Sequence, residues 1–276
     1  MKNKTVLITG GTSGLGKETA KALATRGATV VFTSRDHSKG ENARQDIISA
    51  SHNEDVHVML CDLASLSAVQ SFCSEYDRTF TRLDVLLHNA GTWDFSRRES
   101  RDGIENIFAV NYLAPFLMTR LLLPKLIASR PSRIISVVSG LHWGTIQFDN
   151  LEFKRNFSGF KAYRQSKLAL LLFTRLLART LHNKGVTVNC AEPGMVATDL
   201  SRDAGFVSRT IFRTFGRTPE RGAETSVLLA SSEQVANITG ECFSGTKIGR
   251  TSEQSKDLET ARKLWEISEH YVRDYI

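Results

Sequence analysis

Cysteine and proline are scarce in this chain, and long apolar runs are lacking. Its 276 residues include four cysteines and five prolines. Cys61, Cys73, Cys190 and Cys242 lie far apart with no CxxC pair, which excludes a disulfide-stapled miniprotein and favours reduced thiols in a cytoplasmic protein. Because no run reaches about 18 apolar residues, we expect no transmembrane segment. Strand-like sequence starts at Thr5, so we also expect no secretion signal.

The overall composition is that of an ordinary globular chain. Hydrophobic residues make up 41% and charged residues 24%, which excludes disorder and a collagen-like repeat. The formal net charge of +7 suits an anionic cofactor, an anionic lipid or nucleic acid. Because the basic residues are dispersed, nucleic-acid binding is not expected. No HExxH or similar spacing is present, so we expect no metal site.

Short β-branched runs alternate with longer helical patterns along the chain. Expected strands are Thr5–Thr9, Thr29–Thr33, Val56–Leu60, Val85–His88, Arg133–Val138, Val186–Ala191 and a seventh near Glu241–Phe243. Expected helices lie around Leu15–Arg26, Ser38–Ser51, Leu66–Phe80, Gly103–Ser129 and Ala162–Asn183. This alternation predicts a single α/β domain over 1–276, of the Rossmann type: a doubly wound, parallel, seven-stranded sheet with helices on both faces.

The alternation breaks at about 199–219. Apolar and basic residues there each recur every four positions: Val207, Ile211 and Phe215 on one side, and Arg209, Arg213 and Arg217 on the other. The pattern predicts a short amphipathic helix inserted into a crossover. We expect this insertion to be a lid over a substrate cleft; a plain surface helix and a basic contact with a membrane surface are the alternatives.

A glycine-rich turn joins the first strand to the first helix. It reads Gly10-Gly11-Thr12-Ser13-Gly14-Leu15-Gly16, with glycines spaced differently from GxGxxG. Glycines at this position let the backbone approach a pyrophosphate, whose charge is stabilised by the helix N-terminus. We expect Gly10, Thr12, Ser13, Gly14, Leu15 and Gly16 to bind a dinucleotide, although a bare turn would use glycine too.

The end of the second strand predicts which dinucleotide is bound. An acidic residue at this point would favour NAD, whereas Ser34 and Arg35 come first here. A guanidinium beside a hydroxyl can hold a 2′-phosphate, and Lys17 adds positive charge. We therefore expect NADP (NADPH), with Asp36 as the feature that favours NAD. The alternative for Arg35 is a solvated surface charge.

Asp62 and Leu63 follow the third strand. A carboxylate at this position can accept a hydrogen bond from an adenine amino group. It can equally cap the helix that begins near Ser65, and the residues alone leave both possibilities open.

Tyr163 and Lys167 stand four positions apart at the start of a long helical pattern, which places both on one face. A neighbouring ammonium stabilises a phenolate and lowers its pKa, which suits the tyrosine to acid/base work. Ser139 follows the fifth strand at the sheet edge where ligands bind. Asn111 is a polar amide among apolar residues and needs a partner, either water or a backbone carbonyl. We expect these four to be catalytic.

Taken together, these motifs resemble the short-chain dehydrogenase/reductase family over nearly the whole chain. The matching segments are Thr9–Gly16, Asp62, Asn89-Ala90-Gly91, Asn111, Ser139, Tyr163, Lys167, Pro193-Gly194 and Thr198. The resemblance implies that Tyr163 is the acid/base and that Lys167 binds the nicotinamide ribose. Ser139 would then position the substrate oxygen and Asn111 would hold a relay water.

The remaining implied roles concern the cofactor. Asn89, Ala90 and Gly91 would support its cleft, Thr198 would contact the carboxamide, and Pro193, Gly194 and Val196 would line the same region.

Within the family the chain looks most like the retinol dehydrogenase branch, which mostly uses NADP. The segments that carry this likeness are Gly16–Ala20, Ser34–Asp36, Phe148–Leu151, Ala162–Lys167 and Ala261–Trp265. His88 and Glu192 depart from the family pattern beside the cofactor cleft. The N-terminal membrane helix of many animal members is not seen here, which argues against membrane attachment and a retinoid substrate.

These residues predict NADP-dependent hydride transfer to or from a small apolar carbonyl or alcohol. Aromatic and apolar residues are expected to line the substrate cleft: Trp93, Phe95, His142, Trp143, Met195, Phe206 and Phe212. Core packing is the alternative for each, and a structural role is the alternative for His142. Competing functions are a carbon–carbon double-bond reductase of the protochlorophyllide reductase type and a non-catalytic NADPH-binding regulator. The resemblance also implies a homo-oligomer that pairs through Gly103–Ser129 and Ala162–Asn183.

Overall fold

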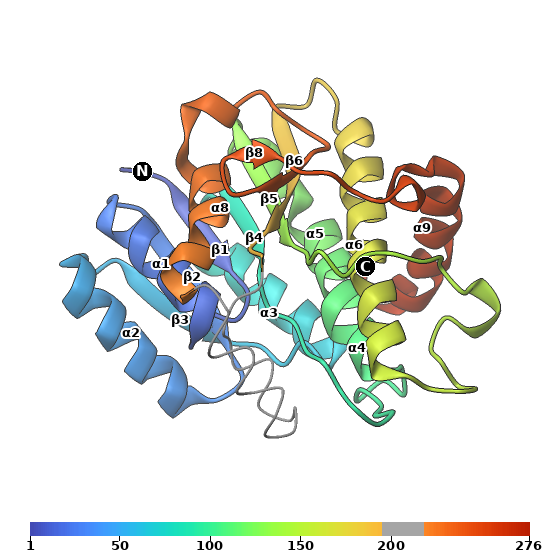
Figure 1. Ribbon diagram of the computed structural model, residues 1–276. Coiled ribbons are helices and arrows are strands. Elements are labelled where there is room, and N and C mark those ends of the chain that lie inside the picture. Colours follow the sequence, from blue (N-terminus) through green and yellow to red (C-terminus); the bar gives the residue numbers. More distant parts are fainter. Residues whose placement is uncertain (195–217) are drawn as a thin grey trace.

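The computed structural model describes residues 1–194 and 218–276, which form one twisted sheet between helices (Figure 1). The strand order is β3-β2-β1-β4-β5-β6-β7-β8. All neighbouring strands pair in parallel except β7 and β8, which are antiparallel. The strands are β1 (Thr5–Ile8), β2 (Thr29–Ser34), β3 (Val56–Leu60), β4 (Val85–His88), β5 (Ser132–Val137), β6 (Val186–Glu192), β7 (Cys242–Ser244) and β8 (Lys247–Ile248).

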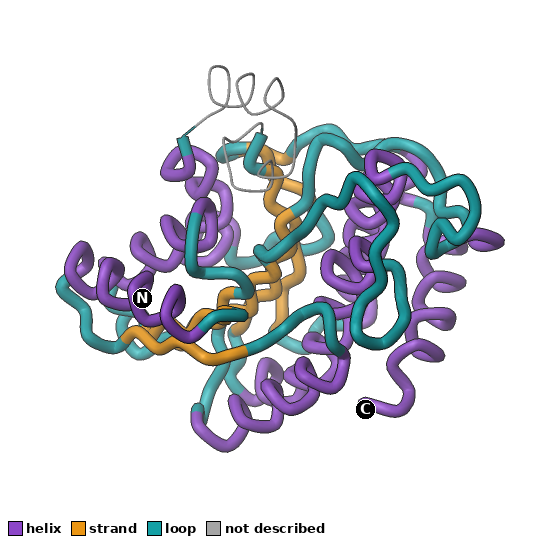
Figure 2. Tube along the Cα trace, turned by 90° about the horizontal axis from the view of Figure 1, so that it is seen from below, coloured by secondary structure: helices purple, strands orange, loops and turns teal. Residues whose placement is uncertain are grey.

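Helices cover both faces of the sheet, as the view from below shows (Figure 2). One face carries α1 (Gly14–Thr25), α2 (His37–Ser51) and α8 (Pro219–Ser231). The other carries α3 (Leu66–Thr79), α4 (Asn106–Phe108), α5 (Ala114–Ala128) and α6 (Gly159–Thr180), with α9 (Leu258–Val272) packed outside α6.

Two apolar cores lie on either side of the sheet because side chains alternate along each strand. In β1, Val6 and Ile8 belong to the core beneath α1, α2 and α8, whereas Leu7 belongs to the core beneath α3, α5 and α6. All four residues of β1 are buried. Burial on both faces explains why the central strands are continuous apolar runs without an alternating polar face.

The predicted doubly wound α/β fold is confirmed, with one correction to the sheet. The sequence predicted seven strands, but an eighth, β8, follows the tight turn at Gly245 and Thr246 and pairs with β7. It spans two residues, which is too short for a periodicity signal. The helices α8 and α9 were also not predicted.

The expected helix over Gly103–Ser129 runs from Asn106 to Ala128, with a π turn at Ala109–Leu113. By length and composition this helix could cross a membrane, contrary to the expectation that no apolar run is long enough. However, 72% of its apolar window is buried inside the fold, which is typical of a core helix.

The C-terminal helix α9 covers α5 and α6, the two helices through which pairing was expected. Trp265 packs edge-on against Phe116, with ring centroids 4.9 Å apart, and stacks on Phe173 at 5.7 Å. Ser268 and Tyr112 share a hydrogen bond of 2.9 Å. This face is therefore occupied by the chain's own helix, and the homo-oligomer expected to pair through these two helices stays a prediction.

The direction of the chain reverses between β1 and β4. From β1 the chain adds β2 and β3 on one side, then crosses to β4 on the other. The helices that leave β1 and β4 lie on opposite faces, so a crevice opens beyond the carboxyl ends of these strands. Ligands bind at this point in doubly wound sheets. The segments that follow β1 and β4 are the glycine turn and Asn89–Gly91.

Candidate functional site

The glycine turn after β1 is held by the ends of its two neighbouring strands. Gly10 N–H donates to Thr33 Oγ1 at 3.0 Å, and Asn89 Nδ2 donates to the carbonyls of Thr9 and Gly10 at 2.9 and 3.0 Å. A Cβ at Gly16 would lie 2.0 Å from the Gly10 oxygen, so only glycine lets the helix start this close to the turn.

The start of α1 fits a phosphate group. Its N-cap residue Ser13 makes no side-chain cap hydrogen bond, and its first turn has no acidic residue. By contrast α2, α3, α6, α8 and α9 each have a side-chain cap. The first N–H groups of α1 therefore have no side-chain acceptor from the cap residue and can donate hydrogen bonds to an anion. Thr12 and Ser13 lie within the glycine turn, and Leu15, in the first turn of α1, is buried.

The end of β2 leaves a guanidinium available. Arg35 is exposed and has no ion-pair partner within residues 1–194 and 218–276. Asp36, which could have favoured NAD, caps α2 by accepting from Lys39 N–H at 2.8 Å. Ser34 donates to the Asp36 carbonyl at 2.7 Å.

Lys17, expected to add charge near Arg35, does not do so as a free cation. Its ammonium pairs with Asp46 of α2 at 2.5 Å. Sequence reasoning missed this partner because the two residues are brought together by the packing of α1 on α2.

Asp62 is not a helix cap. Ser65 caps α3 by accepting from Ala68 N–H at 3.3 Å. Asp62 accepts from Ala64 N–H at 3.1 Å, and its other oxygen lies 3.3 Å from Arg101 Nε. Contact of Asp62 with an adenine stays a prediction. Leu63, the next residue, is buried.

His88, one of the two departures from the family pattern, faces away from the crevice. Its Nε2 lies 2.7 Å from Thr119 Oγ1 of α5, and burial lowers its pKa to about 3. The imidazole is therefore neutral. The following residues Asn89, Ala90 and Gly91 are half-buried along the crevice, and a Cβ at Gly91 would come within 3.5 Å of Lys167 Nζ.

Tyr163, Lys167 and Ser139 converge at the carboxyl edge of β5. Tyr163 and Lys167 lie on α6 and are 7% and 4% exposed. The Lys167 ammonium lies 5.6 Å from the centre of the Tyr163 ring and donates to the Val137 carbonyl at 3.0 Å. The Ser139 hydroxyl lies close enough to the Tyr163 phenol to lower its pKa. Three of the four residues predicted to be catalytic are thus adjacent.

Burial and neighbours set the charge of this group. Burial raises the pKa of Tyr163 to about 12, and the neighbouring Ser139 hydroxyl acts in the opposite direction. Burial also lowers the pKa of Lys167 to about 8. At neutral pH the phenol therefore carries its proton and the amine is mostly an ammonium.

Asn111 lies in the π turn and connects the loop after β4 to α6. Its oxygen accepts from Thr92 N–H at 2.7 Å, and its Nδ2 donates to the Thr92 carbonyl and to Ser166 Oγ, both at 3.0 Å. The partner that the sequence required is thus a backbone carbonyl together with a hydroxyl. Because both N–H bonds are used, a relay water would have to bind elsewhere on this residue. Extra turns of this kind are frequent at functional sites.

Trp93 forms the wall next to the tyrosine. Its ring stacks on Tyr163 with centroids 4.7 Å apart and an interplanar angle of 18°. Phe95 and Phe160 lie 6.3 and 6.0 Å from the same indole and are 58% and 44% exposed. An aromatic surface thus leads from solvent to the phenol. Phe160 was not identified from the sequence, because an aromatic in the first turn of a helix gives no signal of its own.

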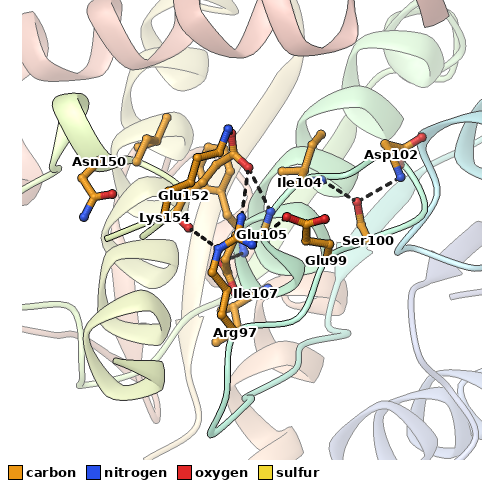
Figure 3. A network of polar contacts seen from close by, with 12 residues as sticks. Arg97, Glu99, Ser100, Asp102, Ile104, Glu105, Ile107, Asn150, Glu152 and Lys154 are labelled. Atoms are coloured by element: carbon orange, nitrogen blue, oxygen red, sulfur yellow. Dashed lines mark hydrogen bonds and ion pairs between the residues drawn. The ribbon is translucent and has the colours of Figure 1, made fainter. Parts of the chain in front are cut away.

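The loop that carries Trp93 is fixed by the polar network of Figure 3. Glu105 is fully buried and accepts from Ile107 and Phe108 N–H at 2.9 and 2.8 Å. Its own N–H donates to Glu152, which also lies 3.8 Å from Arg97. Burial raises the pKa of Glu105 to about 7, helped by Asp94 and opposed by Arg97 and the backbone hydrogen bonds.

The remaining predicted substrate and cofactor residues, and Glu192, are placed as follows. Trp143 is 55% exposed beside the Ser139 loop, whereas His142 is 2% exposed and hydrogen-bonded to the protein at both nitrogens, so it does not line an open cleft. Glu192, Pro193 and Gly194 follow β6, with a Glu192 oxygen against Gly140. Four predicted site residues, the Phe212 position and most of the proposed lid lie outside the described residues: Met195, Val196, Thr198 and Phe206.

Comparison with known proteins identifies the fold and its relatives. A family model described as short chain dehydrogenase matches residues 4–205. Human retinol dehydrogenase 13 is 41% identical over 279 residues, which cover 98% of this chain and 84% of that protein. Mouse retinol dehydrogenase 14 is 41% identical over 289 residues, covering 99% and 86%.

Solved structures with the same fold also match this chain. An uncharacterised protein from Mycobacterium paratuberculosis is 33% identical, with a TM-score of 0.81 over 99% of this chain and 94% of that one. A structure described as an NAD(P)-dependent gluconate 5-dehydrogenase from Beutenbergia cavernae, with NADP bound at low occupancy, is 25% identical, with a TM-score of 0.72 over 88% and 95%. The chain therefore belongs to the short chain dehydrogenase family and is similar, within it, to the retinol dehydrogenases.

Proposed function

We propose that this protein is an NADP(H)-dependent oxidoreductase that interconverts an apolar carbonyl compound and its alcohol, with Tyr163 as the acid/base. NAD(P)-dependent oxidoreduction is the reaction class of its family. The observation that carries the proposal is the convergence of the Tyr163 phenol, the Ser139 hydroxyl and the buried Lys167 amine. A chain that only bound the cofactor would have no use for this arrangement.

The chain's own residues supply the proton chemistry. The protonated Tyr163 donates its proton to a substrate carbonyl oxygen, and in the opposite direction the phenolate accepts a proton from an alcohol. Ser139 holds that oxygen beside the phenol. The Lys167 ammonium stabilises the phenolate, which lowers the cost of the charged state in a buried site. Nicotinamide, when bound, supplies or accepts the hydride.

The preference for NADP rests on the end of β2. Arg35 is exposed and pairs with no carboxylate among the described residues, while the Asp36 carboxylate is engaged as the cap of α2. A guanidinium that has no acidic partner suits a 2′-phosphate, because it can donate two parallel hydrogen bonds. The uncapped N-terminus of α1 would hold the pyrophosphate.

The apolar character of the substrate rests on the aromatic surface beside Tyr163. Trp93, Phe95 and Phe160 offer ring faces and no charge. By their names, the curated relatives act on retinol, a largely apolar alcohol, and the aromatic surface supports the same class of substrate here.

Replacing Tyr163 by phenylalanine tests the acid/base role. We expect Y163F to lose turnover of aldehydes, ketones and steroids, measured by NADPH absorbance, while NADPH affinity measured by fluorescence is retained. The matched control is Y76F, which removes a buried hydroxyl of α3 that donates to the Arg82 carbonyl and should keep turnover. Equal loss of turnover and cofactor binding in Y163F would show that the tyrosine is structural.

Replacing Arg35 by aspartate tests the phosphate site. In R35D the carboxylate repels a 2′-phosphate and can accept from a free 2′-hydroxyl, so the ratio of kcat/KM for NADPH over NADH should fall by about 100-fold. R78D, at an exposed position near the end of α3, is the control for charge reversal. An unchanged ratio in R35D would remove the case for NADP.

A further inference from the structure

His142 is buried, although Gly140 and Trp143 in the same loop are exposed. It follows Ser139 by three positions and precedes Trp143, which is 55% exposed, yet its own side chain is 2% exposed. A buried imidazole needs a partner for each nitrogen. Both partners are present, and both are backbone groups of this chain. His142 therefore holds other parts of the protein together and does not face a ligand.

The hydrogen bonds fix the tautomer of the ring. Nδ1 lies 2.7 Å from the Ser139 carbonyl oxygen, which can only accept, so Nδ1 carries the hydrogen. Nε2 lies 3.1 Å from Ser252 N–H, which can only donate, so Nε2 is the acceptor. The Ser252 hydroxyl also reaches the His142 carbonyl at 3.4 Å. The ring is thus a neutral bridge between the Ser139 loop and the segment around Ser252.

The segment around Ser252 is anchored to the helix that carries the tyrosine. Ser255 Oγ donates to the Ser252 carbonyl at 2.6 Å. Arg175 of α6 donates to Ser255 Oγ at 2.5 Å and to Thr251 Oγ1 at 2.8 Å. Tyr163 is itself a residue of α6. Hydrogen bonds through His142 and Ser252 therefore tie the Ser139 loop to the helix that carries Tyr163.

We propose that His142 is a positioning residue, which holds Ser139 at the distance and angle from Tyr163 that the reaction requires. The proposal rests on the proposed function. The turn from Ser139 to His142 is closed by Leu141 N–H, which donates to Ser139 Oγ at 3.1 Å, and by the Nδ1–H bond to the Ser139 carbonyl. Loss of the ring removes the hydrogen bond to the Ser139 carbonyl and leaves the serine less constrained.

Three substitutions distinguish the contributions of the two hydrogen bonds that the His142 ring makes. H142N keeps an N–H donor near the position of Nδ1. H142Q keeps an acceptor near the position of Nε2. H142F fills the space with neither group. We expect kcat in H142F to fall by 10- to 100-fold, on the order expected for misplacing a reacting group by about 1 Å, with KM for NADPH unchanged. H142N should recover most of the loss and H142Q little of it.

Two further measurements distinguish positioning from a general loss of structure. In an S139A background the hydroxyl is gone, so H142F should lower kcat no further. The pH limb of alcohol oxidation should move to higher pH in H142F, because the nearby Ser139 hydroxyl lowers the pKa of Tyr163 and a displaced serine does so less. Full additivity of H142F and S139A, or an H142F enzyme within about twofold of wild type, would overturn the proposal.

Hydrogen exchange tests the geometry without turnover. In the full-length protein the Leu141 amide should exchange faster in H142F than in wild type and regain protection in H142N. Unchanged exchange in H142F would refute the positioning role even in an active enzyme. If exchange changes as expected while the wild type turns over no carbonyl compound, the proposed function fails and the role of His142 in holding the loop stands.

Discussion

A buried amine and a buried phenol side by side both resist carrying a charge, and for the same reason. Burial disfavours the ammonium of Lys167 and the phenolate of Tyr163. At the 5.6 Å between the ammonium and the phenol ring, opposite charges on the two groups would stabilise each other. The lysine is therefore most useful when the phenol loses its proton. This coupling predicts that the amine affects the pH dependence of the reaction more than the binding of substrate.

Lys167→Met keeps the length of the side chain and removes its charge. We expect kcat to fall by about 100-fold and the rising pH limb of alcohol oxidation to move upward, because the phenolate loses its stabilising charge. Stopped-flow rates across the pH range measure both effects. K161M, at an exposed position in the first turn of α6, is the control. A pH limb that stays in place would show that the lysine only packs.

Glu105 gives stability a pH dependence of known sign. Its pKa rises from an ordinary 4.5 to about 7 in the fold, so between these values the folded chain holds a proton that the unfolded chain has lost. Stability from this group is complete below about pH 4.5 and is lost as the pH rises through about 7, an effect on the order of 3 kcal/mol.

Denaturant unfolding of E105Q across this pH window checks the sign. The difference in unfolding free energy between wild type and E105Q should shift in favour of E105Q as the pH rises. E99Q alters a half-exposed carboxylate in the same loop, paired with Arg97 at 2.6 Å, and should show no such trend. A wild type that gains stability relative to E105Q between pH 5 and 8 would contradict the assignment.

Single residues differed in how far the sequence could reveal them. Ser139, Tyr163 and Lys167 were predicted together because each follows a recognisable strand or begins a periodic helix. The place of His142 could not be predicted, because its burial depends on Ser252, 110 positions away. The stacking of Trp93 on Tyr163 was missed for the same reason, since the loop and the helix meet only in the fold.

Among the elements, the central strands were the most predictable. β4 has the bounds that its apolar run predicted, because burial on both faces leaves an unbroken signal. The edge strand β3 also has its predicted bounds, although only Val56 in it is buried. The π turn could not be predicted from the sequence. The partners of the Asn111 amide within it, Thr92 and Ser166, lie 19 and 55 positions away and meet it only in the fold. The helix α9 has an amphipathic pattern that was read only as part of the resemblance.

Trp265→Ala tests how strongly α9 is held. The indole contacts Phe116 and Phe173 and lies 5.6 Å from the Arg120 guanidinium, so its removal leaves a cavity between three helices. We expect a loss of about 3 kcal/mol in unfolding free energy, at the lower end for large aromatics because the ring is only partly buried. W143A, at an exposed position, should stay within about 0.5 kcal/mol of wild type. Equal effects would mean that α9 adds little stability.

For the whole molecule, the position of α9 restricts how two copies can meet. Helices α5 and α6 are covered, and Arg120 of α5 forms an ion pair with Glu269 of α9. Pairing through α5 and α6 would require α9 to leave a largely apolar interface. We expect hydrogen exchange in α5 and α6 to be the same at low and at high protein concentration. Protection of these two helices that grows with concentration would show that α9 is displaced in a dimer.

The two rims of the sheet are used very differently. Every described residue with a proposed chemical role follows the carboxyl end of a strand or lies on a helix that faces that rim. The opposite rim has short exposed connections, such as Gly27 and the run from His182 to Gly185. An epitope tag or a fluorescent domain inserted at Asn183 would therefore lie at the rim opposite the proposed active site. The protein could be immobilised or imaged through this insertion while the proposed site stays accessible to substrate.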